Sequence, residues 1–209
     1  GEMTTHQSWL VIFVVALQKV GHTTQEATMQ VNDELMESIL ANSYKNFHAK
    51  SLDYICLSRD EKKTRKFYLF DGDAGKVPEV VHPHTHRYNF ATFGHAGEII
   101  DWQYAFHLSY TKIKNENVKT YEMYRFFTPL NGGQGFVESG YEVDLLKHNP
   151  RNITKYIPWP IETKYHDIHT LQIVSDQAMI EIFQYEDIIK NNEPTHTFSL
   201  DGIPVIDSG

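Results

Sequence analysis

Three histidines stand within five residues of each other in the run His82-Pro83-His84-Thr85-His86. Alternate residues of a β-strand point to the same face, so His84 and His86 can approach one centre from a single strand. Imidazole nitrogen binds zinc, iron, nickel, copper and manganese to varying degrees. The run therefore predicts a transition-metal site. Its alternative is a histidine-rich surface loop whose rings bond to backbone carbonyls.

Segments with a β-like pattern surround these histidines and would position them. From about residue 52 onward, short runs rich in aromatic and β-branched residues alternate with turns. The predicted strands are 53–58, 66–70, 80–93, 98–110, 119–127, 141–146, 153–157, 168–175 and 178–185. Leu130–Gly140 is predicted as a loop, Asn149-Pro150 as a break, and the tail from Lys190 as polar and turn-rich. Many short strands of this kind are typical of a sandwich or barrel.

The N-terminal part has a helical pattern instead. Thr23 and Glu26 have the spacing of a capping box, and residues 24–42 follow with apolar side chains in steps of four. These apolar positions are Ala27, Val31, Leu35 and Ile39. We predict a helical arm over residues 1–48 and a β-barrel domain over 49–209. The apolar face of the helix must cover the barrel or a partner subunit. Together with the apolar run Trp9–Leu17, it would supply the buried surface of a homodimer, which we expect.

Composition excludes several classes of protein. The net charge is −8, and the basic run Glu61–Lys66 reads as a solvated hairpin tip, so nucleic acid is not an expected partner. The single cysteine, Cys56, cannot form an internal disulfide, which suits a reducing compartment. The apolar run Trp9–Leu17 is shorter than the roughly 20 residues of a spanning helix. We therefore expect a cytoplasmic protein with no membrane partner.

The histidine stretch resembles the first motif of the cupin superfamily, which reads Gly, His-x-His, Glu, Gly. His84 and His86 match the two histidines, and Gly97 falls close to the closing glycine. The resemblance covers roughly residues 50–188. It implies a mostly β fold, a cupin-type double-stranded β-helix (jelly-roll) barrel, here with an N-terminal helical arm.

The second cupin motif implies a third histidine at the start of a later strand. His169 matches it best, because it follows a proline-rich turn and precedes alternating apolar residues. His166, three residues earlier, is the competitor. The resemblance thus implies one divalent transition metal bound by His84, His86 and His169.

The glutamate of the first motif is missing: the motif places it near Ala91, where the sequence has no glutamate. One outcome is an all-histidine site, as in the thiol dioxygenases that cysteine dioxygenase exemplifies. In the other, a carboxylate arrives from Glu98 or Asp101, and His82 is a further candidate ligand. Neutral ligands leave a divalent ion with its full charge, which favours an anionic or thiolate substrate.

These points predict a metal-dependent oxidoreductase, a mononuclear non-haem Fe(II) dioxygenase for a small anionic or thiol substrate. Zinc, nickel and manganese are the other metals considered. A metal-dependent lyase or isomerase on a small polar acid, and a non-enzymatic cupin binding protein, are the alternatives.

Five further residues are candidates for the walls of the site, each with an ordinary core or surface role as its alternative. Tyr88 shares strand parity with His84 and His86, and Tyr104 and Trp102 share parity on the following strand. The predicted catalytic residues are Tyr88 and Tyr104. The predicted substrate-binding residues are Arg125, Arg87 and Trp102.

Overall fold

The computed structural model describes part of the chain in detail. The described residues are 33–44, 52–71, 82–108, 115–129, 132–190 and 192–204. Internal contacts divide the chain into Gly1–Met36 and Glu37–Gly209, and the second unit holds all of the strands found in the described residues. Within the described residues, no helix is both long enough and apolar enough to cross a membrane.

Helix α2 (Asp33–Ala41) forms the last part of the helix predicted over 24–42. Ser43, just after the helix, links it to the first strand. Its Oγ donates to Ile39 O at 2.6 Å and accepts from the backbone N of Cys56 at 3.0 Å. The remainder of that helix and the run Trp9–Leu17 lie outside the described residues. The helical arm over 1–48 and the homodimer stay predictions.

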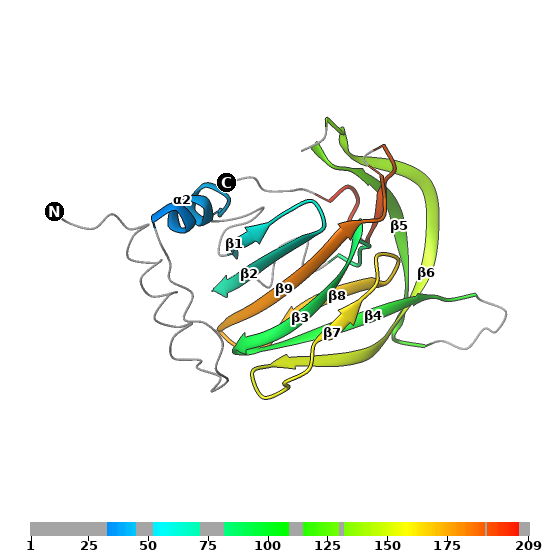
Figure 1. Cartoon of the computed structure of the whole chain (residues 1–209). Helices are drawn as coiled ribbons and strands as arrows, with labels where there is room; N and C mark the ends of the chain where they lie inside the picture. The colour runs from blue at the N-terminus through cyan, green and yellow to red at the C-terminus, as the bar shows by residue number, and fades with distance from the viewer. Residues whose placement is uncertain are drawn as a thin grey trace. The chain divides into compact units, whose positions relative to one another are not determined.

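The described strands form two antiparallel sheets, as Figure 1 shows. Sheet A has the order β1 (Leu52–Arg59), β2 (Lys63–Asp71), β9 (Gln177–Asp187), β3 (Tyr88–Ala96), β7 (Ile161–Thr163). Sheet B has the order β10 (Thr195–Ser199), β5 (Val118–Phe127), β6 (Gly135–Thr154), β4 (Glu98–Phe106), β8 (Ile168–Ile173). The prediction of a mostly β protein is confirmed, and sheet B is curled through its long strands β5 and β6.

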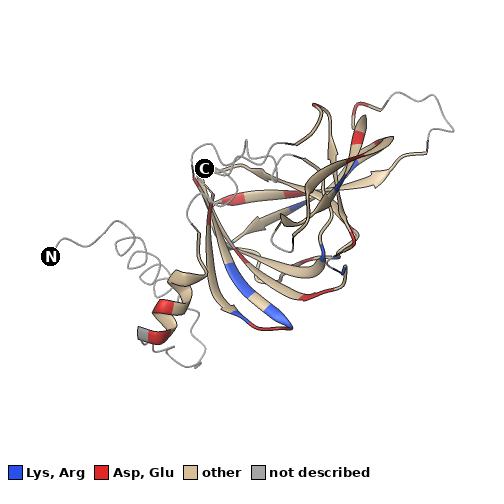
Figure 2. Ribbon diagram, turned by 90° about the horizontal axis from the view of Figure 1, so that it is seen from above, with Lys and Arg blue, Asp and Glu red and all other residues tan. Residues whose placement is uncertain are grey.

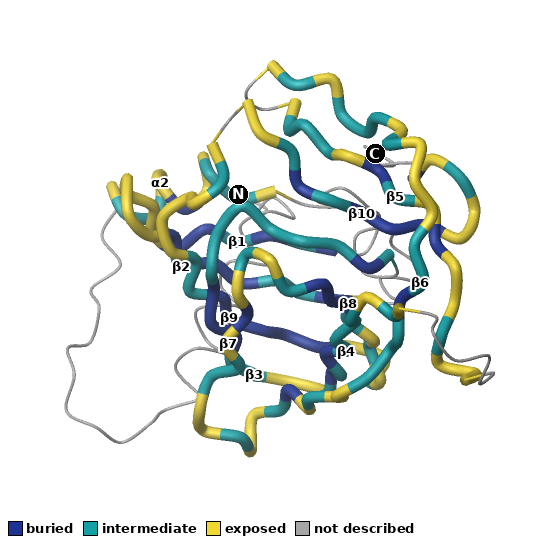
Figure 3. Tube along the Cα trace, turned by 90° about the vertical axis from the view of Figure 1, so that its right-hand side faces the viewer, coloured by how far each residue is buried: buried dark blue, intermediate teal, exposed yellow. Residues whose placement is uncertain are grey.

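The main hydrophobic core lies between the two sheets, because its members come from both. It comprises Leu52, Phe70, Phe90, Ala178, Ile180 and Ile182 of sheet A with Ile99 and Ile153 of sheet B. All eight residues are buried, and Figure 3 colours the buried parts of the chain dark blue. Removing this apolar surface from water is the main stabilising contribution to such a fold.

A second cluster belongs to sheet B alone. It comprises Tyr121, Leu145, Ile168 and Phe198, with Tyr104 packed against them. Along β8, Ile168 and His169 are neighbours and therefore point to opposite faces. The second cluster thus lies on the face of sheet B that His169 does not use.

The β1–β2 hairpin is confirmed, but its tip is shorter than predicted. Asp60 accepts hydrogen bonds from the backbone N of Lys62 and Lys63 at 2.8 and 3.0 Å, which closes the turn. The predicted tip Glu61–Lys66 is wrong for its last four residues, which lie in β2. Figure 2 marks the basic residues of this strand in blue, and one of them, Lys66, is only 5% exposed.

Strand β6 also differs from the prediction, since it runs unbroken through part of the predicted loop and through Asn149-Pro150. The pairing of β4 with β6 shifts register between Asp101 and Gln103, opposite these two residues. Asn149 there has a φ of 47°, as a bulge permits. Proline has no N–H to donate, so it fits a strand where the ladder is interrupted. Strand β10 likewise lies in the tail that was predicted to be turn-rich.

Candidate metal centre

The segment that carries His84 and His86 is held between β8 and β10. His84 N donates to His169 O at 3.1 Å, and His169 N donates back to His84 O at 3.2 Å. On the other side His84 bridges Thr197. The continuous strand predicted over 80–93 is wrong, because β3 starts at Tyr88 and the histidines precede it on an isolated bridge.

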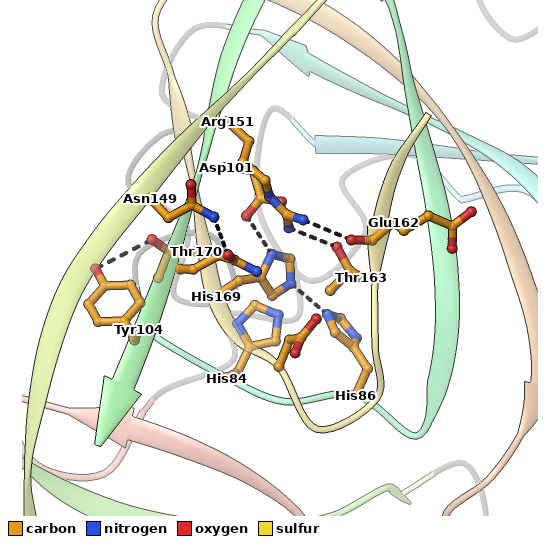
Figure 4. A network of polar contacts seen from close by, with 12 residues as sticks. His84, His86, Asp101, Tyr104, Asn149, Arg151, Glu162, Thr163, His169 and Thr170 are labelled. Carbon is orange, nitrogen blue, oxygen red and sulfur yellow. Dashed lines mark hydrogen bonds and ion pairs between the residues drawn. The ribbon is translucent and has the colours of Figure 1, made fainter. Parts of the chain in front are cut away.

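This pairing brings the three predicted ligands together. Residues directly opposite in an antiparallel pair project to the same side, so His84 and His169 face one another. His86 lies two residues after His84, and its ring centroid is 4.8 Å from that of His84 and 5.0 Å from that of His169. Potential ligand atoms of the three residues all lie within 4.8 Å of one another. Figure 4 shows the three rings converging.

The competing histidines lie outside this cluster. His166 has a side chain that is 66% exposed and lies 3.8 Å from Asp167. His82 contributes its backbone carbonyl, which the Nδ1 of His84 contacts at 2.9 Å. The structure therefore brings His169, and not His166, to the pair His84 and His86.

The hydrogen bonds of two of the rings, His84 and His169, are made by Nδ1 and leave Nε2 available to a metal. His169 Nδ1 lies 3.0 Å from Asp101 Oδ1. Because a carboxylate only accepts hydrogen bonds, Nδ1 carries the proton of the neutral ring, and Nε2 keeps a lone pair that can bind a metal. His84 Nδ1 donates to the His82 carbonyl in the same way. His86 Nε2 lies 2.8 Å from His169 Nε2. Two nitrogens at right angles on one octahedral ion would be about 3.0 Å apart, given bonds of about 2.1 Å.

Burial keeps two of these imidazoles neutral. It lowers the pKa of His84 to about 3, with the nearby His169 as the second cause. Burial likewise holds the pKa of His86 well below its usual value, and the neighbouring His84 and His169 lower it further. A metal ion binds the neutral ring, so these ligands need lose no proton at neutral pH. The donor set fits a divalent transition metal.

A charged pair lies behind His169. Asp101 is only 2% exposed, and its second oxygen accepts from Arg151 Nη2 at 2.5 Å. Arg151 also donates to Glu162 O at 2.8 Å and to Thr163 Oγ1 at 3.2 Å. A carboxylate that bonds the outer nitrogen of a ligating histidine fixes the ring and raises its basicity.

This geometry gives Asp101 a different place from the one considered in the sequence. The sequence offers Asp101 as a possible metal ligand. In the structure its oxygens contact His169 and Arg151 instead, so it orients His169. Glu98 is the first residue of β4, two positions before Ile100, and lies outside the cluster. Arg151 was missed, because its relation to Asp101 comes from strand pairing across 50 residues.

Tyr88 is brought next to the cluster. Its ring centroid is 5.5 Å from that of His86, and its hydroxyl is buried, which raises its pKa. Lys66 Nζ lies 3.3 Å from the same hydroxyl. Lys66 was also missed, although its alternation with Tyr68 and Phe70 in β2 signals an interior position.

Tyr104 and Trp102 are placed on the other face of sheet B. Tyr104 pairs with Ile168 and Trp102 with Thr170, so both share the face opposite to His169. Tyr104 packs in the second core cluster. The indole of Trp102 donates to Gln172 at 2.8 Å and lies beneath the ammonium of Lys147. The structure does not bring them to the metal centre.

The two arginines predicted to bind substrate are engaged elsewhere. Arg125 is exposed on β5 and donates to Glu138 O at 3.3 Å. Arg87 forms an ion pair with Asp187 at 3.3 Å and donates to Glu193 O at 3.2 Å. It precedes Tyr88 and follows His86, so strand alternation directs it away from both.

No protein-family model matches the chain, and the search of curated proteins finds no match. The histidine cluster is therefore the principal guide to function. Three nitrogen donors occupy half of an octahedral shell or three corners of a tetrahedron. Either arrangement leaves at least one position for a small molecule.

Proposed function

We propose that His84, His86 and His169 bind one divalent transition-metal ion in a cupin-type barrel. We propose further that the protein is an enzyme, a mononuclear non-haem Fe(II) dioxygenase for a small anionic or thiol substrate. The observation that carries this is the convergence of three imidazoles with Asp101 bonded to the outer nitrogen of one of them.

The order of strand pairing supports the cupin-type barrel. In sheet A, the early strands β2 and β3 alternate with the late strands β9 and β7. In sheet B, β8 lies between β4 and the segment of His84. Such interleaving of the two halves of a chain is what a jelly roll produces when it folds into two sheets.

The charge of the site supports an anionic or thiolate substrate. All three donors are imidazoles, and Asp101, the carboxylate that contacts His169, is paired with Arg151. The positive charge of a divalent ion would therefore be little reduced by the protein. When bound, Fe(II) would supply open positions at which substrate and O₂ meet.

The protein's own residues would orient the ligands and limit access of water. Asp101 holds the ring of His169. The ring of Phe90 lies 4.7 Å from that of His86, and the ring of Tyr88 lies 5.5 Å from it on β3. The two rings give the site an apolar wall, and the attraction between a metal ion and an anionic substrate is stronger in such low-dielectric surroundings.

The first test is the metal content of untagged protein, measured by mass spectrometry. We expect near-stoichiometric metal in the parent, loss of metal in His84→Ala and in His169→Ala, and retention in the matched control His166→Ala. A parent that takes up no metal after anaerobic reconstitution would contradict the metal centre.

The second test addresses the reaction. Iron-dependent oxygen uptake with a panel of thiols and small acids is the expected result. Turnover that persists without O₂ and with zinc would instead favour a lyase or isomerase. Metal binding without turnover of any compound in the panel would favour a binding protein.

A further inference from the structure

Lys66 is a cation inside the barrel. It lies on β2 between Thr64 and Tyr68 in the strand's alternation, on the face that also carries the core residue Phe70, and is 5% exposed. An ammonium group strongly favours water over an apolar interior unless it is paired. Its position therefore requires compensation from its surroundings.

Polar atoms and aromatic rings provide part of that compensation. Lys66 Nζ donates to Gln184 Oε1 at 2.7 Å and to Tyr88 Oη at 3.3 Å. It lies 5.7, 5.4 and 5.2 Å from the ring centroids of Tyr54, Tyr68 and Tyr88. Ring faces attract a cation through their quadrupole.

These contacts leave the positive charge without a counter-charge. Within the described parts of the chain, no carboxylate forms an ion pair with Lys66. An ammonium carries three N–H groups, and the side chains of Gln184, Tyr88 and Tyr68 are its hydrogen-bond partners, all of them uncharged. Among the described residues, the charge of Lys66 therefore has neutral partners but no carboxylate to neutralise it.

Tyr88 connects this cation to the metal centre. Its hydroxyl contacts Lys66, and its ring lies beside that of His86. The charge of Lys66 also contributes to the low pKa of His86, after burial and the two other histidines. On the other side, Gln184 lines a surface hollow of about 430 Å³ beside the β1–β2 turn.

We propose that Lys66, with Tyr88 and Gln184 beside it, binds the carboxylate of a small substrate whose other end reaches the metal centre. This inference rests on the function proposed above. One ammonium matches one negative charge, whereas a phosphate dianion would leave a buried charge uncompensated. The carboxylate would accept a hydrogen bond from Lys66 and neutralise its charge.

The test uses the whole chain loaded with Co(II), because a thiolate bound to Co(II) produces a charge-transfer absorption band without turnover. The probes are mercaptoacetate, which carries a carboxylate, and 2-mercaptoethanol, which carries a neutral hydroxyl on a similar thiol. We expect the parent to bind mercaptoacetate about tenfold more tightly or better, the effect of one charged hydrogen bond.

Lys66→Met removes the charge while keeping much of the side chain's volume. We expect it to lose the preference for mercaptoacetate while its Co(II) stoichiometry and its affinity for 2-mercaptoethanol stay unchanged. Lys63→Met, on an exposed residue of the same strand, is the matched control and should keep the preference. Chelation by the carboxylate itself would raise the affinity in parent and variant alike, so the difference between them isolates Lys66.

The outcomes separate the two proposals. A preference that is as large in Lys66→Met as in the parent overturns the carboxylate site and leaves the metal centre standing. A parent that binds no Co(II) overturns the proposed function and this inference with it, and metal content measured before titration identifies that case. If Lys66→Met does not fold, Tyr88→Phe should reduce the preference about threefold, as loss of one neutral hydrogen bond does. An unchanged preference there overturns the inference as well.

Discussion

Arg151 and Asp101 stand directly opposite each other on β6 and β4, and the carboxylate between them joins Arg151 on one side to His169 on the other. His169, on β8, pairs in turn with His84 through an isolated bridge. Contacts between neighbouring strands thus connect a partly exposed guanidinium to one of the three clustered histidines. The positions of the ligands therefore depend on the pairing of several strands.

The carboxylate of Asp101 should strengthen metal binding. We expect Asp101→Asn to weaken it by about 10- to 100-fold, since the amide holds and polarises the ring of His169 less well. Competition with a chelator measures the affinity. Glu98→Gln, at a carboxylate outside the cluster on the same strand, should change it little. Equal affinities for Asp101→Asn and the parent would remove Asp101 from the site.

Arg151 should matter for stability even without metal. Arg151→Met leaves the buried carboxylate of Asp101 without its partner, so we expect the free energy of unfolding to fall by about 3 kcal/mol. Urea denaturation of metal-free protein measures this. Arg125→Met, at an exposed arginine, should change it by less than about 0.5 kcal/mol. Similar losses in both variants would contradict a special role for Arg151.

Glu181 should make the fold sensitive to acid. Burial favours its protonated form, but hydrogen bonds from His95 and Arg65 outweigh burial and lower the pKa of Glu181 below its ordinary value of 4.5. Because its pKa is lower when folded, its contribution to stability is present above about pH 4.5 and is lost as the pH falls through the folded value.

The variant Glu181→Gln isolates that contribution. Near neutral pH it should unfold with a free energy lower by about 2 kcal/mol, as expected when a buried charged hydrogen bond is lost. The difference from the parent should shrink steadily below pH 4.5. Denaturant titrations across this range provide the measurement, and a difference that does not vary with pH would argue against the ion pairs.

Gly97 should be the glycine that the turn between β3 and β4 requires. It has a φ of +66°, and a Cβ there would lie 2.2 Å from Gln177 O. Gly140 has a φ of +76° with no atom within 4 Å of such a Cβ. Gly140→Ala should therefore cost about 1 kcal/mol from backbone strain alone, and Gly97→Ala clearly more. Thermal unfolding of the pair checks this, and equal costs would be the contrary result.

Local patterns in the sequence predict the strands and the histidine pair well, because both depend on a period of two residues. The same period predicts that Tyr104 and Trp102 share a face, but it does not say which face. Asp101 has the opposite parity, and that parity turns out to be the inward one. The pairing of β4 with β8 decides which face of β4 points inward, and the sequence pattern of β4 alone does not reveal that pairing.

Charged residues were harder to place than apolar ones. Lys66 belongs to a basic run, and such runs are usually solvated, although its alternation with Tyr68 and Phe70 puts it on the buried face of β2. Arg151 follows a proline that suggests a break, whereas a bulge lets β6 continue to it. In both cases the fold accommodates a residue that its local context disfavours.

The contact between His86 and His169 spans 83 residues of the chain. An ion held by both would act as a removable cross-link that closes a long loop, and such closure restricts the unfolded chain more than the folded one. Metal supply would then govern how much of the protein persists in a cell, because a metal-depleted chain opens more often and is degraded faster. The abundance of the protein would report on the availability of its own metal.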